Sequence, residues 1–100
     1  MPATHYLSLL LENVRRFPDR AAYRVFRDEE WREVTWTAFI QRIRRVASAL
    51  LHHGVAEGEL VAIFAPNSPE WTEVDLGCLA VRAVSVPIHA TSSADALRQI

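Results

Sequence analysis

Lysine is absent from this chain, and all eleven basic residues are arginine. These residues therefore supply no lysine for a Schiff base, a phosphate contact or general base catalysis. Cysteine is nearly absent as well: Cys78 stands alone, which excludes an internal disulfide and a cysteine-rich metal site. Glycine occurs three times, at the isolated positions Gly54, Gly58 and Gly77, so no glycine-rich phosphate loop is present.

An excess of charge of either sign is also missing. The formal net charge is −1, with eleven arginines against twelve acidic residues. This balance argues against nucleic acid as a partner, because binding to phosphates needs a concentrated positive surface. The arginines are scattered, and the group Arg42, Arg44 and Arg45 is interpreted as a solvated helix face rather than a phosphate-binding patch.

Long hydrophobic runs are lacking too. No apolar stretch approaches the roughly 20 residues of a membrane span, and the first residues lack the basic start of a signal peptide. We therefore expect a soluble, cytoplasmic protein. Half of the residues are nevertheless hydrophobic, which is rich for a small stand-alone domain. The chain is predicted to be part of one larger domain, with no internal boundary within residues 1–100.

Two kinds of pattern mark the N-terminal third. Residues 4–16 are predicted to form an amphipathic helix with Thr4 as its cap. Its apolar positions recur at helical spacing: Leu7, Leu10, Leu11 and Val14. Residues 21–27 and 31–35 are rich in strand-forming types and predict a hairpin around the polar turn 28–30, although that turn contains no glycine.

A second helix is predicted over residues 36–52. Thr35 is its expected N-cap, and Gly54 is its expected left-handed stop. One apolar stripe runs along it and should be buried: Phe39, Ile40, Ile43, Val46, Ala47, Leu50 and Leu51. His52 and His53 are adjacent, about 100° apart on a helix, which is poor geometry for binding one metal ion.

The order strand, helix, strand follows. Residues 60–65 are apolar without alternation, so both faces of this strand are expected to be buried. Ser68 is the predicted cap and Pro69 the first residue of a helix reaching about residue 82, and residues 84–88 form a second buried strand. Such a unit normally has parallel strands joined by a right-handed crossover.

The helix of this unit carries two further expectations. Glu70 and Glu73 fall in its first turn, where carboxylates oppose the positive end of the helix dipole. From Val74 onward it is apolar on nearly every side, so additional protein must cover it. Cys78 lies in that apolar run and is expected to be a buried structural thiol rather than a nucleophile.

Three polar residues occupy positions where α/β sheets bind ligands. Asn67 follows the first parallel strand, and His89 and Thr91 follow the second, at the carboxyl ends of both. Loop hydrogen bonding is the simpler interpretation of all three. A triad drawn from Ser92, His89 and Asp95 is not supported, because a capped helix start explains these residues better, and no catalytic, cofactor-binding or metal-binding residue is assigned.

A series of short motifs carries a resemblance to a known family. They are NVRRFPDRAA at 13–22, VTW at 34–36, the stretch 47–63 ending in GVAEGELVAI, NSPEW at 67–71 and AVSVPI at 83–88. In this order they resemble the N-terminal part of the AMP-forming acyl-CoA synthetases, members of the adenylate-forming superfamily. Trp31 and the segment 91–94 are most similar to those of long-chain fatty-acid-CoA ligases.

The resemblance implies a fold and an activity. The fold is α/β: the start of a large N-terminal domain with βαβ units and a mostly parallel sheet, preceded by a helix and a hairpin. The activity of the longer parent is ATP-dependent conversion of a fatty acid to an acyl-adenylate, then thioester formation with CoA, using ATP, Mg²⁺ and CoA. A homodimer and a peripheral membrane contact are left open.

The family's functional motifs are not among these residues. Its Ser/Thr/Gly-rich phosphate loop, acidic magnesium motif and C-terminal lysine would lie further along a parent chain, so the fragment alone is expected to be inactive. Two alternatives remain: a non-catalytic interaction or dimerisation module, and a ligase for another carboxylic acid. Open reading frame length would distinguish the module from a ligase.

Three positions depart from the family pattern. The resemblance implies that Arg82 stands where glycine is usual, that Glu59 replaces an aspartate, and that His89 stands where tyrosine or another residue is usual. If Arg82 adopts the left-handed backbone of a helix stop, its side chain costs about 1 kcal/mol relative to glycine.

Overall fold

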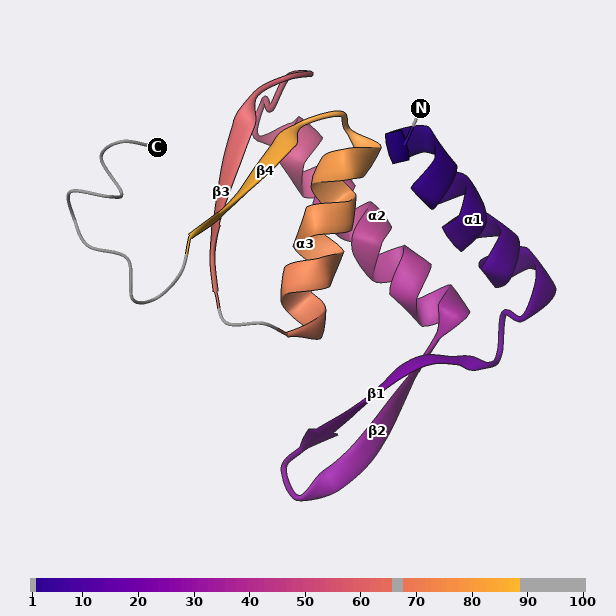
Figure 1. Ribbon diagram of the computed structural model, residues 1–100. Coiled ribbons are helices and arrows are strands. Elements are labelled where there is room, and N and C mark those ends of the chain that lie inside the picture. The colour runs from indigo at the N-terminus through magenta and orange to yellow at the C-terminus, as the bar shows by residue number, and fades with distance from the viewer. Residues whose placement is uncertain (1, 66–67, 89–100) are drawn as a thin grey trace.

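The computed structural model describes residues 2–65 and 68–88, and within them the chain forms three helices and four strands (Figure 1). Every element predicted over these residues is present, and the predicted α/β class is confirmed. In chain order the elements are α1 (Pro2–Arg16), β1 (Ala21–Arg27), β2 (Glu30–Thr35), α2 (Trp36–His52), β3 (Leu60–Phe64), α3 (Pro69–Ala80) and β4 (Val84–Ile88).

Helix α1 begins earlier than predicted. It starts at Pro2, whose fixed φ suits the first turn of a helix, so Thr4 lies inside α1 and is not its cap. Its apolar face is also narrower than expected. Leu7 and Leu10 are half-buried, whereas Leu11 is 45% exposed.

Strands β1 and β2 form the predicted antiparallel hairpin, which projects away from the helices (Figure 1). Its turn has only two residues, because Glu30 already belongs to β2. Asp28 and Glu29 have φ values of 54° and 63°. Two successive left-handed residues match the twist of a hairpin, and here they do so without glycine.

Helix α2 has both predicted ends. The Thr35 side chain accepts a hydrogen bond from the Ala38 N–H (3.1 Å), as an N-cap does. At the other end Gly54 has a φ of 82°, and the Val55 N–H bonds the Leu50 carbonyl (3.0 Å). This 6→1 bond belongs to the Schellman type of helix stop.

The apolar stripe of α2 is buried over only part of its length. Phe39, Ile40 and Ile43 are buried, Leu50 is half-buried, and Leu51 is 60% exposed. The expectation of full burial is therefore wrong for Leu51. Helix α3 crosses α2 at Val46, more than one turn before Leu51, and the end of α2 extends past that contact.

The βαβ unit is confirmed. Strands β3 and β4 pair in parallel, in a register running from Leu60–Val84 to Phe64–Ile88, with α3 between them in sequence. The Ser68 hydroxyl accepts a hydrogen bond from the Trp71 N–H (3.2 Å), so Ser68 is the predicted cap.

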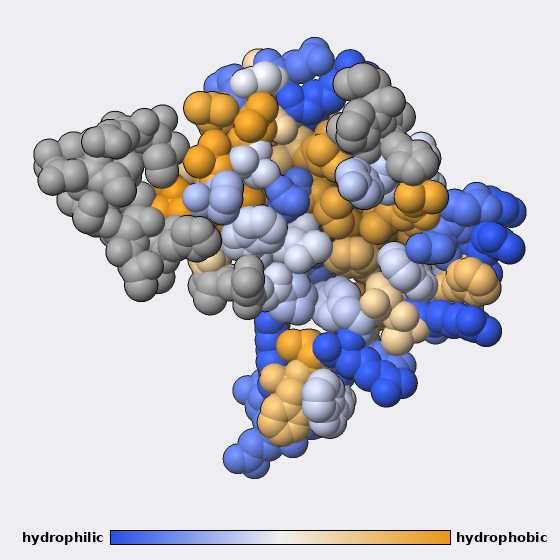
Figure 2. Space-filling model, viewed as in Figure 1, coloured by the Kyte–Doolittle hydropathy of each residue, from blue (hydrophilic) through white to orange (hydrophobic). Residues whose placement is uncertain are grey.

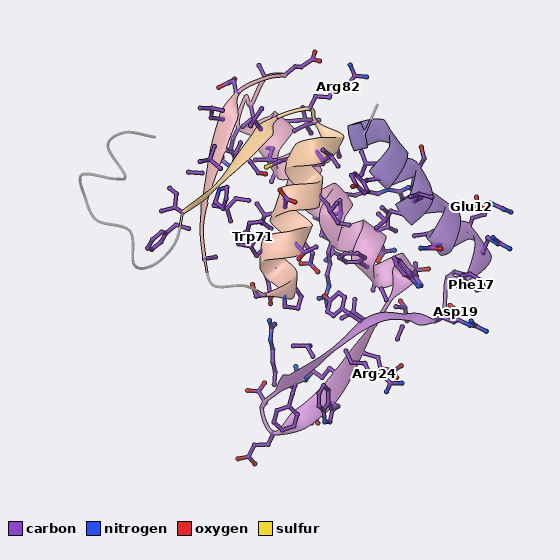
Figure 3. The ribbon with its side chains drawn as sticks, viewed as in Figure 1. Glu12, Phe17, Asp19, Arg24, Trp71 and Arg82 are labelled. Carbon is purple, nitrogen blue, oxygen red and sulfur yellow. The ribbon has the colours of Figure 1, made fainter. Side chains whose placement is uncertain are left out.

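Helix α3 ends with a left-handed residue that is not glycine. Its last helical residue is Ala80, and Arg82 has a φ of 60°. The Ala83 N–H bonds the Cys78 carbonyl (2.9 Å), which completes the same type of stop as in α2. The Arg82 side chain is exposed (Figure 3). Its Nη1 lies 3.4 Å from Glu57 Oε1.

Burial of β3 differs from the prediction. Ile63 is 5% exposed, but Leu60 and Phe64 are each 63% exposed. Helix α3 contacts both strands from one side, and the second face of this two-stranded sheet is bare in the described part of the chain. Apolar surface accordingly gathers over the β3–β4 sheet (Figure 2).

Helices α2 and α3 pack closely because of Gly77. A Cβ atom at this position would lie 2.8 Å from Cβ of Val46 and 3.3 Å from the backbone nitrogen of Ala47. The next residue, Cys78, is 1% exposed, which confirms its prediction as a buried thiol.

Candidate functional site

The carboxyl ends of β3 and β4 lie at one edge of the parallel sheet, where Phe64 pairs with Ile88. Helix α3 begins at Pro69, close after the end of β3. Ligands of α/β proteins bind at such an edge. The residues that the sequence placed there lie outside the described residues: Asn67, His89, Thr91, Ser92 and Asp95.

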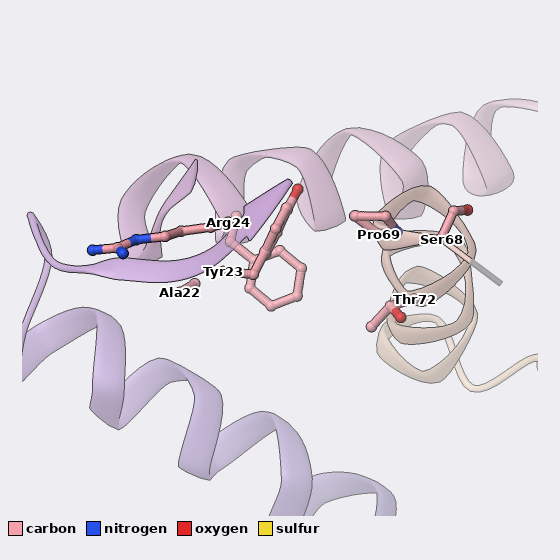
Figure 4. A pocket seen from close by; sticks show the side chains of 7 residues that line it. Ala22, Tyr23, Arg24, Ser68, Pro69 and Thr72 are labelled. Atoms are coloured by element: carbon pink, nitrogen blue, oxygen red, sulfur yellow. The ribbon is translucent and has the colours of Figure 1, made fainter. Parts of the chain in front are cut away.

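A hollow of roughly 360 Å³ adjoins the start of α3, between this helix and the hairpin (Figure 4). Its lining comprises Ala22, Tyr23, Arg24, Phe39, Ser68, Pro69 and Thr72. The rings of Tyr23 and Phe39 meet edge to face, with centroids 5.5 Å apart. The hollow is therefore mainly apolar, with the hydroxyls of Ser68 and Thr72 on the α3 side.

Beside the hollow, three side chains from three elements form a polar cluster. Glu73 of α3 is 7% exposed, and its Oε2 accepts a hydrogen bond from the Tyr23 hydroxyl (2.9 Å). Arg42 of α2 donates to the same Tyr23 oxygen (3.1 Å) and lies 3.6 Å from the Glu73 carboxylate. Burial, and then the neighbouring Glu73 carboxylate, raise the pKa of Tyr23.

This cluster corrects two predictions. Glu73 does not lie in the first turn of α3, where Glu70 is the one acidic residue, and it is a buried carboxylate held by Tyr23 of β1. Arg42 is not simply solvated, because it contacts the cluster. Sequence reasoning missed Tyr23 altogether: it lies 50 positions before Glu73, and no local pattern relates two residues at that separation.

A second polar contact joins the hairpin to α3. Arg27 Nη2 donates to Glu70 Oε2 (2.7 Å). The hydrogen bond from Arg27 is the main cause that lowers the pKa of Glu70, and it raises the pKa of Arg27 in return. Glu70 thus keeps the first-turn position predicted for it and gains a partner on β1.

The other candidates remain apart. Arg44 and Arg45 are exposed, and the rings of His52 and His53 are 5.7 Å apart. Burial, with a smaller effect of Asp75, raises the pKa of Cys78, which disfavours the thiolate needed of a nucleophile. Residues 2–65 and 68–88 contain no group of three potential metal ligands.

Two further observations concern polar atoms and membranes. Within the described residues, every buried side-chain nitrogen or oxygen has a hydrogen-bond partner. None of the helices in that part of the chain combines the length and the apolar character needed to cross a membrane. The cluster of Tyr23, Glu73 and Arg42 and the Arg27–Glu70 pair hold helices and strands together.

Comparison with known proteins defines the class. The sequence matches the AMP-binding enzyme family over residues 10–100. The chain therefore belongs to the AMP-binding enzymes, the family to which adenylate-forming acyl-CoA synthetases belong, and the resemblance seen in the sequence motifs is confirmed.

Relatives with known names support this assignment. The chain is 38% identical over 93 residues to a long-chain-fatty-acid–CoA ligase, FadD15, of Mycobacterium bovis, covering 93% of this chain and 16% of the relative. It is 36% identical over 93 residues to a human mitochondrial acetyl-coenzyme A synthetase 2-like protein, covering 91% of this chain and 14% of the relative.

Solved structures show the same fold. The N-terminal subdomain of NpsA from Klebsiella oxytoca superimposes with a TM-score of 0.78 at 27% identity, covering 92% of this chain and 23% of that one. The chain thus spans less than a quarter of the length of each of these proteins. The α/β fold predicted as the start of an adenylate-forming domain is confirmed.

Proposed function

We propose that this chain is part of the N-terminal domain of a long-chain fatty-acid-CoA ligase. The complete protein would activate a fatty acid with ATP to an acyl-adenylate and then transfer the acyl group to CoA. The observation that carries this proposal is the family match over residues 10–100, together with 38% identity to a ligase of that name.

Within such a protein, these hundred residues would act as scaffold. The contacts of Tyr23, Glu73 and Arg42 and of Arg27 with Glu70 join one element to another. The sequence contains no phosphate-binding loop and no lysine. Forming an adenylate requires the triphosphate to be held and its developing charge to be neutralised. ATP, Mg²⁺ and CoA would therefore be bound mainly by other parts of the protein.

A second function is favoured by a specific observation. The acetyl-coenzyme A synthetase 2-like relative is nearly as similar as the fatty-acid ligase, at 36% against 38% identity. A ligase for a short carboxylic acid is therefore the second candidate. The non-catalytic module, a homodimer and a peripheral membrane contact stay predictions.

Substrate choice can be tested with the complete polypeptide that carries these residues. Pyrophosphate release would be measured with ATP, Mg²⁺ and either palmitate or acetate, followed by thioester formation with CoA. We expect turnover with palmitate to exceed turnover with acetate. The reverse order would support the short-acid ligase, and no release with either acid or with aromatic acids would support the non-catalytic module.

The scaffold role has its own test. Titration of the hundred-residue chain with ATP and Mg²⁺ should give no binding heat at micromolar concentrations, whereas the complete polypeptide should bind. Micromolar binding by the hundred residues alone would contradict the scaffold proposal.

A further inference from the structure

The hairpin is firmly anchored at its base. Val34 of β2 is 5% exposed and packs in the core cluster with Phe39 and Ile43. Thr35 caps α2, and the Trp36 N–H bonds the Arg20 carbonyl (3.0 Å). The strand ends nearest α2 are thus part of the folded core.

The distal part of the hairpin is held differently. Phe26 and Trp31 pair across the strands with ring centroids 5.3 Å apart, yet they are 57% and 70% exposed. Because these large apolar side chains lie mostly in solvent, burying them contributes little to holding the hairpin against the helices.

The Tyr23 ring, packed against Phe39, supplies part of that attachment, and polar contacts supply the rest. Tyr23 and Arg27 are four positions apart on β1 and therefore lie on the same face of the strand. Tyr23 contacts Glu73 of α3, and Arg27 contacts Glu70 of the same helix. The Arg27–Glu70 pair is largely exposed and therefore weak. The Tyr23–Glu73 bond has a buried, charged acceptor and is reinforced by Arg42, so it is the stronger of the two.

The hollow beside α3 lies under this attachment, since Tyr23 is both a wall of the hollow and a member of the cluster. We propose that residues 23–33 form a strap that opens as a unit over the hollow, and that the Tyr23–Glu73–Arg42 cluster is the latch that keeps it closed. Opening would leave α2 and α3 packed, because Gly77, Val46 and the buried core residues lie outside the strap. It would break the packing of the Tyr23 ring against Phe39 as well as the latch. The proposal does not depend on which acid the complete protein activates.

Hydrogen–deuterium exchange of the complete polypeptide tests this proposal. Tyr23→Phe keeps the ring packed against Phe39 and removes only the hydroxyl. A hydrogen bond to a charged acceptor contributes enough to stability that amides of the strap should exchange roughly ten- to a hundred-fold faster. Amides of α2 and α3 should keep their exchange rates.

Two further variants make the test specific. Glu73→Gln should accelerate exchange in the same residues, and Tyr23→Phe combined with Glu73→Gln should add little to either alone, since both changes release one latch. Glu33→Gln is the matched control: it breaks the exposed Arg24–Glu33 pair on the same hairpin and should change exchange less than about two-fold.

Three outcomes would overturn the proposal that residues 23–33 open as a strap. Unchanged exchange of residues 23–33 in Tyr23→Phe would show that the hydroxyl does not hold the hairpin. Equal acceleration in all elements would indicate global destabilisation rather than a local opening. An effect of Glu33→Gln as large as that of Tyr23→Phe would show that any loss of polar contact loosens the hairpin.

Discussion

At the scale of single residues, Arg82 is the clearest case of a side chain in a conformation that favours glycine. Its φ of 60° completes the stop of α3, and its carbonyl accepts a hydrogen bond from the Gly58 N–H (2.8 Å). A side chain in this left-handed conformation strains the backbone, as expected in the sequence analysis if Arg82 takes the place of a glycine.

Arg82→Gly should stabilise the intact protein by a few tenths to about 1 kcal/mol, because glycine adopts positive φ without a Cβ penalty. The lost contact with Glu57 is exposed and contributes little. Arg82→Ala is the matched control: it removes the same contact but keeps the strain. Denaturant titration should rank glycine above alanine, and equal stabilities would refute the strain argument.

At Gly77 the opposite effect is expected, because replacing this glycine should destabilise the protein. Alanine is a better helix former by about 1 kcal/mol, yet its Cβ would overlap Val46 on α2. Overpacking costs typically about 1–3 kcal/mol, so Gly77→Ala should destabilise the intact protein in a denaturant titration. Val46→Ala should partly rescue it, giving a double-mutant coupling. Stabilisation by Gly77→Ala would show that the two helices can separate freely.

At the scale of elements, α2 shows that a helix can be predicted with the correct ends while its buried face is predicted only in part. The ends of the helix agree with prediction because Thr35 and Gly54 act locally. The burial of its stripe is decided by where α3 crosses, which depends on Gly77. Ile43 is 1% exposed, so its side chain is expected to contribute more to the free energy of unfolding than Leu50 or Leu51.

Ile43→Ala should therefore lower the free energy of unfolding of the intact protein by about 2–5 kcal/mol, the range for deleting a well-buried aliphatic side chain. Leu51→Ala, on the same helix, should lower it by less than about 1 kcal/mol. Denaturant titration of both variants provides the comparison. A comparable loss at Leu51 would mean that other parts of the protein cover the end of α2.

At the scale of the whole molecule, the bare face of the β3–β4 sheet is the dominant feature. Leu60 and Phe64 are each 63% exposed, and Val84 is 48% exposed. A parallel sheet is normally covered on both faces. The chain spans only 16% of the FadD15 relative, and within the described residues the sequence expectation of two buried faces is not met.

Replacing Leu60 and Phe64 together by threonine should have opposite effects in two contexts. In the hundred-residue chain it should reduce binding of a hydrophobic dye and raise the soluble concentration, since exposed apolar patches promote association. In the complete polypeptide it should cost at least about 2 kcal/mol of stability. Unchanged stability there would show that this face stays exposed.

Local patterns accounted for what depends on neighbouring residues. Helical spacing located α1 and α2, Ser68 and Pro69 located the start of α3, and the order strand, helix, strand predicted the parallel pairing. The hairpin was predicted from two runs of strand-forming residues around a polar turn. It forms without glycine because Asp28 and Glu29 both adopt the left-handed conformation. The start of α1 was misjudged because Thr4, a good cap, competes with Pro2, a good first helical residue.

The sequence by itself determined the elements, most of their ends, and the family, because propensities, caps and motif order are properties of short segments. Tertiary structure alone decided three things: the burial of Glu73 against Tyr23, the close crossing at Gly77, and the exposure of one face of β3. Each of these depends on residues distant in sequence being brought together, or on a neighbour being absent from one side. Hydrophobic burial and polar pairing are set by the whole set of contacts, which no local pattern encodes.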